Sequence, residues 1–351
     1  MSLRLDDYTY ELPEALIAQE PLYPRDHSRL MVVHENREEI IHKHFYDICE
    51  FLSPGDVLVV NNSKVIPARL YGKKVPTGGK VEVLLLEKKP VDNTWECLVR
   101  PGRRVRKGTI IDFSSGKLSG EIIEDLPEGR RVIKFDKNED LDSLIEEIGK
   151  MPLPPYIKKD LEDQQRYQTV YAKWRGSSAA PTAGLHFTDE LIERIKAKGV
   201  KIANVTLHVG LGTFRPVETD DISKHKMHSE YYEISKETVN LLNDAKENNH
   251  KIVAVGTTSV RVLESSASDS NNIIASSGQT DIFIYPGYKW KFVDALITNF
   301  HLPKSSLLML VSSFLSREQI LKVYNVAVEE KYRFFSFGDA MLLMKENNNE
   351  F

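Results

Sequence analysis

Six stretches of the sequence are unusually rich in glycine, small polar residues, amides and histidine. They are residues 61–70 (NNSKVIPARL), 166–172 (RYQTVYA), 176–188 (GSSAAPTAGLHFT), 206–217 (TLHVGLGTFRPV), 256–264 (GTTSVRVLE) and 298–314 (TNFHLPKSSLLMLVSSF). A core helix or strand has no need of such residues close together, whereas ligands commonly bind at loops that follow strands in α/β folds. Each stretch alone is also compatible with a tight turn or a capped helix. Together, the six predict one shared ligand site.

Common catalytic and cofactor-binding motifs are missing or incomplete. The sequence has no GxxxxGK[ST] phosphate loop, and Gly210 and Gly212 lack the third glycine of a dinucleotide-binding turn. The HxxH at residues 225–228 has no HExxH or cysteine cluster to support a metal site. The serines that precede His186 lack a GxSxG elbow. P-loop, dinucleotide, metal and serine-nucleophile chemistry are therefore poorly supported.

Different parts of the chain show two kinds of secondary-structure pattern. Short apolar segments recur about every ten residues between positions 80 and 136, which is typical of a small β-barrel or sandwich. A short helix is predicted at 140–150, and the proline-rich segment 151–155 is a stiff joint. Beyond it, helices and strands alternate, which indicates an α/β fold. We therefore predict an α/β (α+β) protein with a catalytic domain of residues 1–60 and 151–351 and an inserted all-β domain of residues 61–150.

Capping residues mark several of the expected helices. Thr188 precedes two acidic residues and an apolar face, and Ser235 opens a second helix through Val239, Leu242 and Ala245. Ser316 and Gln319 have the spacing of a capping box. Helix starts are therefore expected at 188, 235 and 316.

Charge is unevenly distributed along the 351 residues. The whole chain carries 47 Lys+Arg and 51 Asp+Glu, for a formal net charge of −4. Residues 61–110, however, contain twelve basic and four acidic side chains, a local net charge of +8. A solvated lysine-rich β surface would explain this, but so much asymmetry favours a module that contacts a polyanion.

Two cysteines, Cys49 and Cys97, lie far apart, which excludes a disulfide scaffold and fits a reducing compartment. The N-terminus has no apolar signal region, and no segment approaches the roughly 20 apolar residues needed to cross a bilayer. We expect a soluble cytoplasmic protein.

The polar stretches and their flanks resemble the S-adenosylmethionine:tRNA ribosyltransferase-isomerase family of queuosine biosynthesis. The resemblance runs over nearly the whole chain, with long motifs in the family's order. They lie at residues 6–30, 61–70, 100–108, 149–158, 163–172, 176–188, 208–217, 227–234, 256–264, 284–312 and 334–343. No departure damages a motif.

This resemblance implies a reaction and a fold. The ribosyl part of S-adenosylmethionine is transferred to the aminomethyl group of 7-aminomethyl-7-deazaguanine at the wobble position of a tRNA. The sugar is rearranged to an epoxycyclopentanediol, adenine and methionine leave, and the product is epoxyqueuosine-tRNA. An α/β-barrel-type domain and a smaller β-barrel domain are implied, and the protein is expected to be a monomer. No metal or bound cofactor is implied, because S-adenosylmethionine is consumed as a co-substrate.

The reaction needs a base near the carbon beside the sulfonium and an acid for the leaving adenine, and histidine titrates in the useful range. The expected catalytic residues are His186, His208, His301 and Glu230. The expected substrate-binding residues are Asn61, Asn62, Tyr167, Gln168, Thr182, Gly184, Phe187, Gly210, Gly212, Thr213, Phe214, Thr257, Thr258 and Asn299. The expected tRNA-binding residues are Lys64, Arg69, Arg100, Arg103, Arg104, Arg106 and Lys107.

Aromatic side chains are expected to stack on the extruded wobble base or to hold the sulfonium. The candidates are Tyr167, Tyr171, Phe187 and Phe214, although each also suits an ordinary core position. Two other functions stay open. One is a non-catalytic tRNA-binding protein, and the other is an S-adenosylmethionine-dependent methyltransferase or a small-molecule hydrolase.

Overall fold

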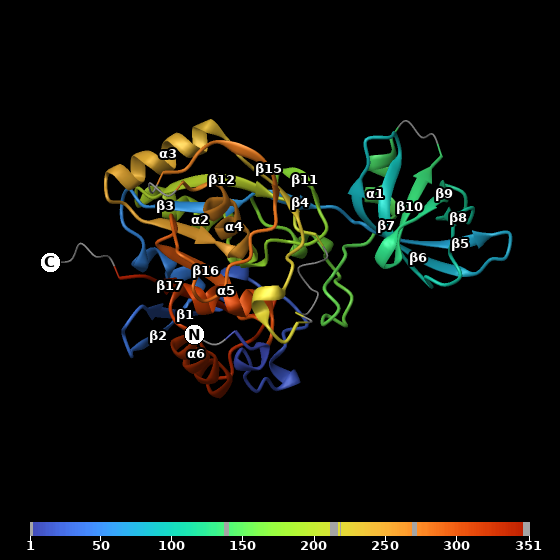
Figure 1. Ribbon diagram of the computed structural model, residues 1–351. Helices are drawn as coiled ribbons and strands as arrows, with labels where there is room; N and C mark the ends of the chain where they lie inside the picture. The colour runs from blue at the N-terminus through green and yellow to red at the C-terminus, as the bar shows by residue number, and fades with distance from the viewer. Residues whose placement is uncertain (1–2, 137–139, 211–216, 218, 269–271, 347–351) are drawn as a thin grey trace. The chain divides into compact units, whose positions relative to one another are not determined.

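The computed structural model describes residues 3–136, 140–210, 217, 219–268 and 272–346 (Figure 1). The chain forms two compact units. Unit 1 contains residues 1–63, 155–174 and 180–351, and unit 2 contains residues 64–154 and 175–179. Unit 1 is mixed α/β and unit 2 is a β-barrel. The predicted fold class, an α/β protein with an all-β barrel, is confirmed.

Unit 1 is built on a nine-stranded mixed sheet with edges at β15 and β2. In spatial order the strands are β15 (Ser276–Thr280), β13 (Glu230–Ile234), β12 (Lys201–Leu207), β3 (Val57–Asn61), β14 (Ile252–Val255), β16 (Ala295–Asn299), β17 (Ala340–Met344), β1 (Arg29–His34) and β2 (Ile40–His44). The strands β12, β3, β14 and β16 are parallel, whereas β16 and β17 are antiparallel. Every residue of β3 is buried, which is typical of a strand covered on both faces.

Helices cover this sheet. They are α2 (Asp189–Ala197), α3 (Lys236–Glu247), α4 (Gly256–Ser266), α5 (Ser306–Phe314) and α6 (Arg317–Glu329). Leu58 and Val60 of β3 pack in one apolar cluster with Leu191 and Ile195 of α2. Short 3₁₀-helices complete unit 1, at η1 (Leu5–Asp7), η2 (Glu14–Leu16), η3 (Arg25–His27), η4 (Phe45–Phe51), η6 (Gln164–Tyr167), η7 (Thr182–His186) and η9 (Ile222–Lys224).

The expected helix caps are present, with one correction. Thr188 Oγ1 accepts the Leu191 amide, Ser235 Oγ accepts the Thr238 amide, and Ser316 Oγ accepts the Gln319 amide. The predicted capping box at Ser316 is wrong in its second half, because Gln319 Nε2 donates instead to the His34 carbonyl, at 2.8 Å. Tertiary contact with the turn after β1 is thus preferred to the local bond.

Unit 2 is a closed six-stranded antiparallel barrel. Its strands, in spatial order, are β10 (Arg130–Phe135), β7 (Thr94–Arg100), β6 (Lys80–Lys88), β5 (Arg69–Val75), β8 (Ile110–Phe113) and β9 (Leu118–Asp125). β10 also pairs with β9, which closes the barrel. Helix α1 (Leu141–Ile148) buries Leu141 and Ile145 in the barrel's core, and η5 (Pro127–Gly129) joins β9 to β10. A two-stranded sheet of β4 (Ser63–Val65) and β11 (Trp174–Ser177) completes the fold.

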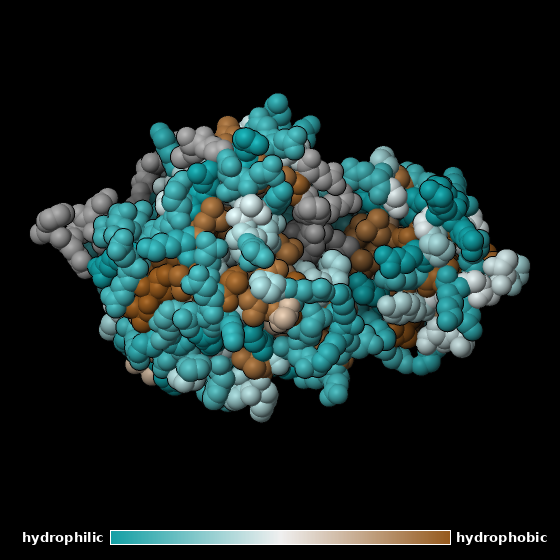
Figure 2. Space-filling view, turned by 90° about the horizontal axis from the view of Figure 1, so that it is seen from below, coloured by the Kyte–Doolittle hydropathy of each residue, from teal (hydrophilic) through white to brown (hydrophobic). Residues whose placement is uncertain are grey.

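The face seen in Figure 2 is predominantly hydrophilic, with separate hydrophobic patches of the kind that folded proteins commonly expose. Within the described residues, none of the helices has the length and apolar character to cross a membrane.

Candidate active site

Four parallel strands of unit 1 end at one edge of the sheet, because parallel strands share the position of their carboxyl ends. The residues at or just after these ends are Asn61 and Asn62 of β3, His208 and Gly210 after β12, Gly256 and Thr257 after β14, and Asn299 and His301 at β16. The stretch at η7 joins them through the hydrogen bond that Thr182 Oγ1 donates to Asn299 Oδ1, at 3.0 Å, and η6 contacts η7. The structure therefore brings the predicted polar stretches of unit 1 toward one edge of its sheet.

His186 lies at the centre of a buried hydrogen-bond chain. Asn299 Nδ2 donates to His186 Nε2 at 3.1 Å, so in the neutral ring Nδ1 carries the proton and donates to Ser28 Oγ at 2.7 Å. The ring stacks on Phe45, with centroids 4.9 Å apart. Burial, followed by the positive charges of Arg333 and Arg25, lowers the pKa of His186 to about 3. This imidazole is therefore neutral and already has a partner on each nitrogen.

His301 is held in the core beyond the end of β16. Its Nε2 contacts Thr298 Oγ1 at 3.1 Å and its Nδ1 contacts Tyr324 Oη at 3.2 Å. Tyr10 Oη donates to the His301 carbonyl at 2.5 Å. Burial lowers the pKa of His301 to about 3. Both ring nitrogens are again used within the protein.

His208 differs from the other two histidines. Its ring is only partly buried, and its Nδ1 contacts Ser63 Oγ at 2.8 Å. The ring stacks on Tyr231, with centroids 5.7 Å apart. Among the described residues, no group is within hydrogen-bonding distance of Nε2. Burial lowers the pKa of His208, against the opposing charge of Glu233. His208 is thus a neutral imidazole with a nitrogen available to a ligand.

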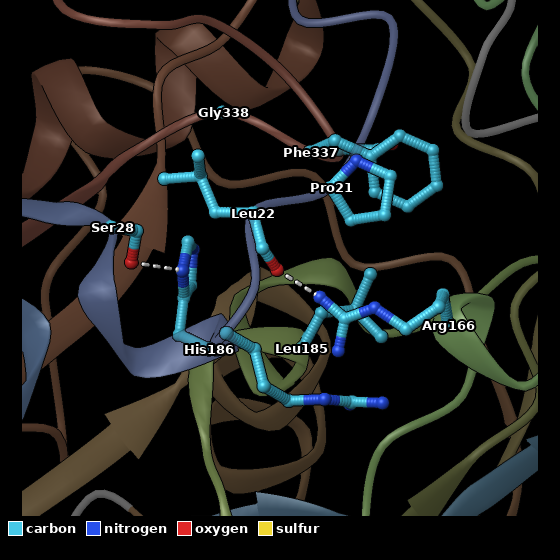
Figure 3. Close-up of a pocket in the computed structure, with 10 residues that line it drawn as sticks. Pro21, Leu22, Ser28, Arg166, Leu185, His186, Phe337 and Gly338 are labelled. Carbon is cyan, nitrogen blue, oxygen red and sulfur yellow. Dashed lines mark hydrogen bonds between the residues drawn. The ribbon is translucent and has the colours of Figure 1, made fainter.

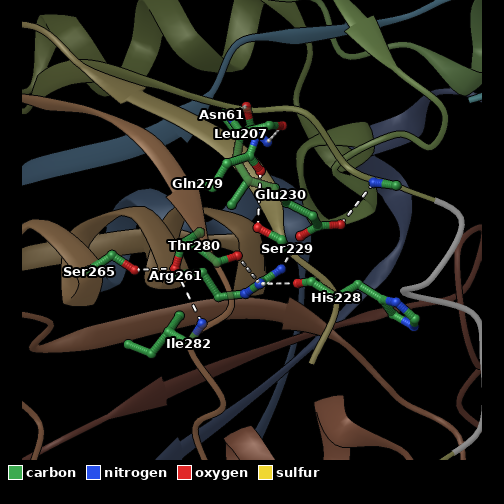
Figure 4. A network of polar contacts seen from close by, with 11 residues as sticks. Asn61, Leu207, His228, Ser229, Glu230, Arg261, Ser265, Gln279, Thr280 and Ile282 are labelled. Carbon is green, nitrogen blue, oxygen red and sulfur yellow. Dashed lines mark hydrogen bonds and ion pairs between the residues drawn. The ribbon is translucent and has the colours of Figure 1, made fainter. Parts of the chain in front are cut away.

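Glu230 holds the backbone at Gly210, two residues after His208. Its Oε1 accepts the Gly210 amide at 2.8 Å, and its Oε2 forms an ion pair with Arg261 of α4. Arg261 also donates to the carbonyls of Thr280 and His228 (Figure 4). Both members of the ion pair are almost fully buried. Glu230 therefore connects the backbone of Gly210 to Arg261 of α4.

Asn61 and Asn62 brace the same edge of the sheet. Asn61 Nδ2 donates to the Leu207 carbonyl at 3.0 Å, and Asn61 Oδ1 accepts the amides of Leu207 and Ser63. Asn62 Oδ1 accepts Thr206 Oγ1 at 2.8 Å. Both side chains are buried, so they fix the ends of β3 and β12 that carry Ser63 and His208.

Two of the aromatic side chains predicted to stack on a ligand are buried in the protein, whereas a stacking ring must be exposed. Tyr167 and Phe187 are fully buried, and Phe187 packs edge-on against Phe45 and Tyr171. Gly184 is packed so closely against the Tyr171 hydroxyl that a Cβ would overlap it. In this structure Tyr167 and Phe187 are core residues of unit 1.

Three other residues predicted to bind substrate lie at the ends of helices. The Gln168 carbonyl accepts Arg25 Nη1 at 2.8 Å. Thr257 is buried in the first turn of α4, where Thr258 Oγ1 is also buried and finds no hydrogen-bond partner among the described residues. Gly212, Thr213 and Phe214 lie outside the described residues.

A pocket opens on one side of His186 (Figure 3). Its polar lining comprises Arg25, Ser28, Arg166, His186 and Ser336. Neither arginine was among the predicted site residues, although Arg25 stands in segment 6–30, which carries the family resemblance, and Arg166 in the polar stretch 166–172.

In unit 2, the loop from Arg100 to Lys107 joins β7 to β8. Arg100, Arg103, Arg104 and Lys107 are exposed, and none has a carboxylate partner among the described residues. Arg106 lies 4.0 Å from Asp125. Val105 is buried, and the buried Arg131 donates to the carbonyls of Val105 and Gly102, so the loop is fixed from inside. Lys64 is partly buried, and Arg69 pairs with Glu82 at 3.3 Å.

One exposed aromatic residue was missed by the sequence reasoning. Trp174 is 54% exposed, and its amide donates to the Asn62 carbonyl at 3.1 Å. Lys173 Nζ lies 5.0 Å from the centre of its ring. This large exposed ring lies next to the Asn62–Ser63 segment and is available for stacking. The sequence alone does not reveal it, because an exposed tryptophan and a core tryptophan differ only in their burial in the folded chain.

Within the described ranges, no group of three or more His, Cys, Asp or Glu side chains is arranged to hold a metal ion.

Comparison with known proteins gives consistent matches. The family described as queuosine biosynthesis protein matches residues 5–343. The S-adenosylmethionine:tRNA ribosyltransferase-isomerase of Desulforamulus reducens is 57% identical over 97% of this chain and 100% of its own length. The protein of the same name from Staphylococcus aureus (strain Newman) is 54% identical with the same coverage. The crystal structure of S-adenosylmethionine tRNA ribosyltransferase from Thermotoga maritima is 43% identical, with a TM-score of 0.55 over 96% of this chain and 100% of that one.

Proposed function

The chain belongs to the queuosine biosynthesis protein family, and from this membership we infer that it is an S-adenosylmethionine:tRNA ribosyltransferase-isomerase. The enzyme transfers the ribosyl part of S-adenosylmethionine to 7-aminomethyl-7-deazaguanine at the tRNA wobble position and rearranges it, giving epoxyqueuosine-tRNA, adenine and methionine. The full-length matches to relatives of this name carry the proposal.

His208 is the base that the site supports best. The sulfonium acidifies the neighbouring C–H bond, so a neutral imidazole with an available nitrogen suffices to remove the proton. Ser63 fixes the ring through Nδ1, and Glu230 fixes the Gly210 turn beside it. The attacking amine belongs to the tRNA base, so the protein needs no covalent nucleophile. His186, His301, Asn61 and Asn299 then act as buried supports that position the reacting groups.

The decisive experiment combines the purified protein, S-adenosylmethionine and tRNA carrying the aminomethyl-deazaguanine. We expect adenine and methionine to be released in equal amounts, and the tRNA to gain the mass of the rearranged sugar. A gain of one methyl group with S-adenosylhomocysteine would identify a methyltransferase. Binding of tRNA without any small-molecule product would identify a non-catalytic tRNA-binding protein.

The exposed cations of the Arg100–Lys107 loop are proposed to contact phosphates of the anticodon arm. Reversing charge in the double variant Arg103→Glu/Arg104→Glu is expected to weaken tRNA binding at least tenfold and to flatten its salt dependence, because fewer counterions are released on binding. The affinity for S-adenosylmethionine is expected to stay unchanged. Filter binding at several salt concentrations measures the first effect and calorimetry the second.

A matched control reverses two exposed basic residues of unit 1, Arg37 and Lys236, which neither site uses. This control is expected to bind tRNA like the wild type. Equal loss of both ligands in the Arg103→Glu/Arg104→Glu variant would indicate a folding role for the loop and contradict the proposed contact.

Trp174 is proposed to stack on a base of the tRNA. Removing a stacking aromatic typically costs about 1–3 kcal/mol, so Trp174→Ala is expected to weaken tRNA binding about 5- to 150-fold. Trp174→Phe keeps a ring and is expected to restore most of the affinity. Quenching of tryptophan fluorescence by tRNA should be present in the wild type and largely lost in Trp174→Phe. Quenching that persists in this variant would contradict the assignment.

We further propose that the protein works as a cytoplasmic monomer. Light scattering of the enzyme alone and with tRNA tests the oligomeric state.

A further inference from the structure

The pocket beside His186 contains two arginines that are fixed by other segments of unit 1. Arg25, the first residue of η3, donates from Nη1 to the Gln168 carbonyl at 2.8 Å. Arg166, in η6, donates to the Leu22 carbonyl, as Figure 3 shows. Each bond joins segments about 140 residues apart in sequence, so both guanidinium groups are held in place before any ligand arrives.

Among the described residues, carboxylates act on this pocket from a distance, and Asp163 acts on both of its arginines. Neither Arg25 nor Arg166 has a carboxylate within ion-pair distance among the described residues. Burial, and then the charge of Arg166, lowers the pKa of Arg25, while Asp163 and Asp189 act in the opposite direction from farther away. Another buried carboxylate of unit 1, that of Asp339, is used elsewhere, because it accepts the backbone amides of Arg29 and Arg333.

A carboxylate is the group that suits such a site. Guanidinium groups with unused N–H donors bind carboxylates and phosphates through strong charge-assisted hydrogen bonds. The hydroxyls of Ser28 and Ser336 line the same pocket and supply neutral polar contacts. His186 forms one wall and is bonded through Asn299 to the carboxyl edge of the sheet. One wall of the pocket is therefore tied to the end of β16.

We propose that the Arg25–Arg166 pocket binds the carboxylate of the methionyl part of S-adenosylmethionine and so positions the sulfonium over the sheet edge. This inference rests on the proposed function. The carboxylate is favoured over a tRNA phosphate because the pocket is lined entirely by unit 1, and because its wall residue His186 is bonded to Asn299 at the end of β16.

The test uses two substrates that differ only in this group. With S-adenosylmethionine and its decarboxylated analogue, the wild-type enzyme is expected to show a kcat/KM ratio of about 10–100 in favour of the carboxylate, as expected for one or two charge-assisted hydrogen bonds. Arg25→Gln and Arg166→Gln are each expected to raise KM for S-adenosylmethionine about tenfold or more and to leave the analogue almost unaffected. The ratio should then approach one.

Controls separate this inference from its alternatives. Arg37→Gln removes an exposed arginine outside both sites and should keep the wild-type ratio. Arg25→Lys keeps the charge and should restore part of the preference, and calorimetric binding of S-adenosylmethionine gives a readout that needs no turnover. Unfolding midpoints verify that each variant is folded.

Three outcomes overturn the proposal. Equal losses with both substrates would mean a structural role for the arginines, and a loss confined to tRNA binding would mean that a phosphate occupies the pocket. A wild-type enzyme that releases adenine but ignores the carboxylate would also contradict it. The absence of adenine release in the wild type would instead refute the proposed function itself.

Discussion

Replacing His208 by alanine is expected to lower kcat for adenine release about 10²- to 10⁴-fold, the usual contribution of a positioned general base. His208 is the one candidate histidine whose described contacts leave a ring nitrogen available. His186 and His301 use both nitrogens in buried hydrogen bonds. Single-turnover release of adenine at saturating substrates measures the effect.

The pH dependence gives an independent check on His208. Because burial lowers its pKa below the ordinary 6.5, the imidazole is neutral and active throughout the range above that value. Activity that depends on His208 should therefore be flat near neutrality and fall only as the pH drops through the lowered pKa. Ser63→Ala frees Nδ1, so its effect on kcat is expected to be smaller than that of His208→Ala, with a displaced acid limb. Near-normal turnover of His208→Ala would contradict the assignment.

Replacing Arg261 by methionine is expected to destabilise the protein by about 3–5 kcal/mol, because it removes the positive charge that pairs with the buried Glu230 carboxylate. Arg261 also donates to the carbonyls of Thr280 and His228, and the variant loses both of these hydrogen bonds. Urea unfolding at a fixed temperature measures the change as a lower midpoint.

The double variant Arg261→Met/Glu230→Met tests the cause. Without either charge, stability is expected to recover much of the loss, since well-packed apolar residues commonly replace a buried ion pair at little cost. Activity is expected to stay low, because the Gly210 amide loses the Glu230 carboxylate that fixes the turn after His208. If the double variant is less stable than Arg261→Met alone, the ion pair is not the source of the destabilisation.

Local patterns predicted many elements correctly. The caps at Thr188 and Ser235 form because a hydroxyl at the first turn satisfies an amide that has no partner within the helix, which depends only on neighbouring residues. The strands of the barrel were visible because Gly, Pro, Asn and Asp interrupt short apolar runs at regular spacing. Gln319 shows the limit of this approach, since its side chain turns to the distant His34 carbonyl.

The roles of the site residues depend on contacts with residues far away in the sequence, so local sequence patterns do not reveal them. Three histidines in similar glycine-rich stretches received very different surroundings, and only burial and hydrogen-bond partners separate His208 from His186 and His301. Trp174, Arg25 and Arg166 entered the site because segments far apart in the chain fold against each other.

The sequence by itself determined the α/β class, the barrel strands, the uneven charge and, through its long ordered motifs, the family. The class, the strands and the charge follow from periodicity, caps and composition, which act over a few residues at a time, whereas the family follows from the resemblance of the motifs. Only the tertiary structure decided which imidazole keeps an available nitrogen, which aromatic ring is exposed and which arginines are left without a carboxylate. Such properties depend on solvent access and on contacts between residues more than 140 positions apart in the sequence. They therefore exist only once the chain has folded.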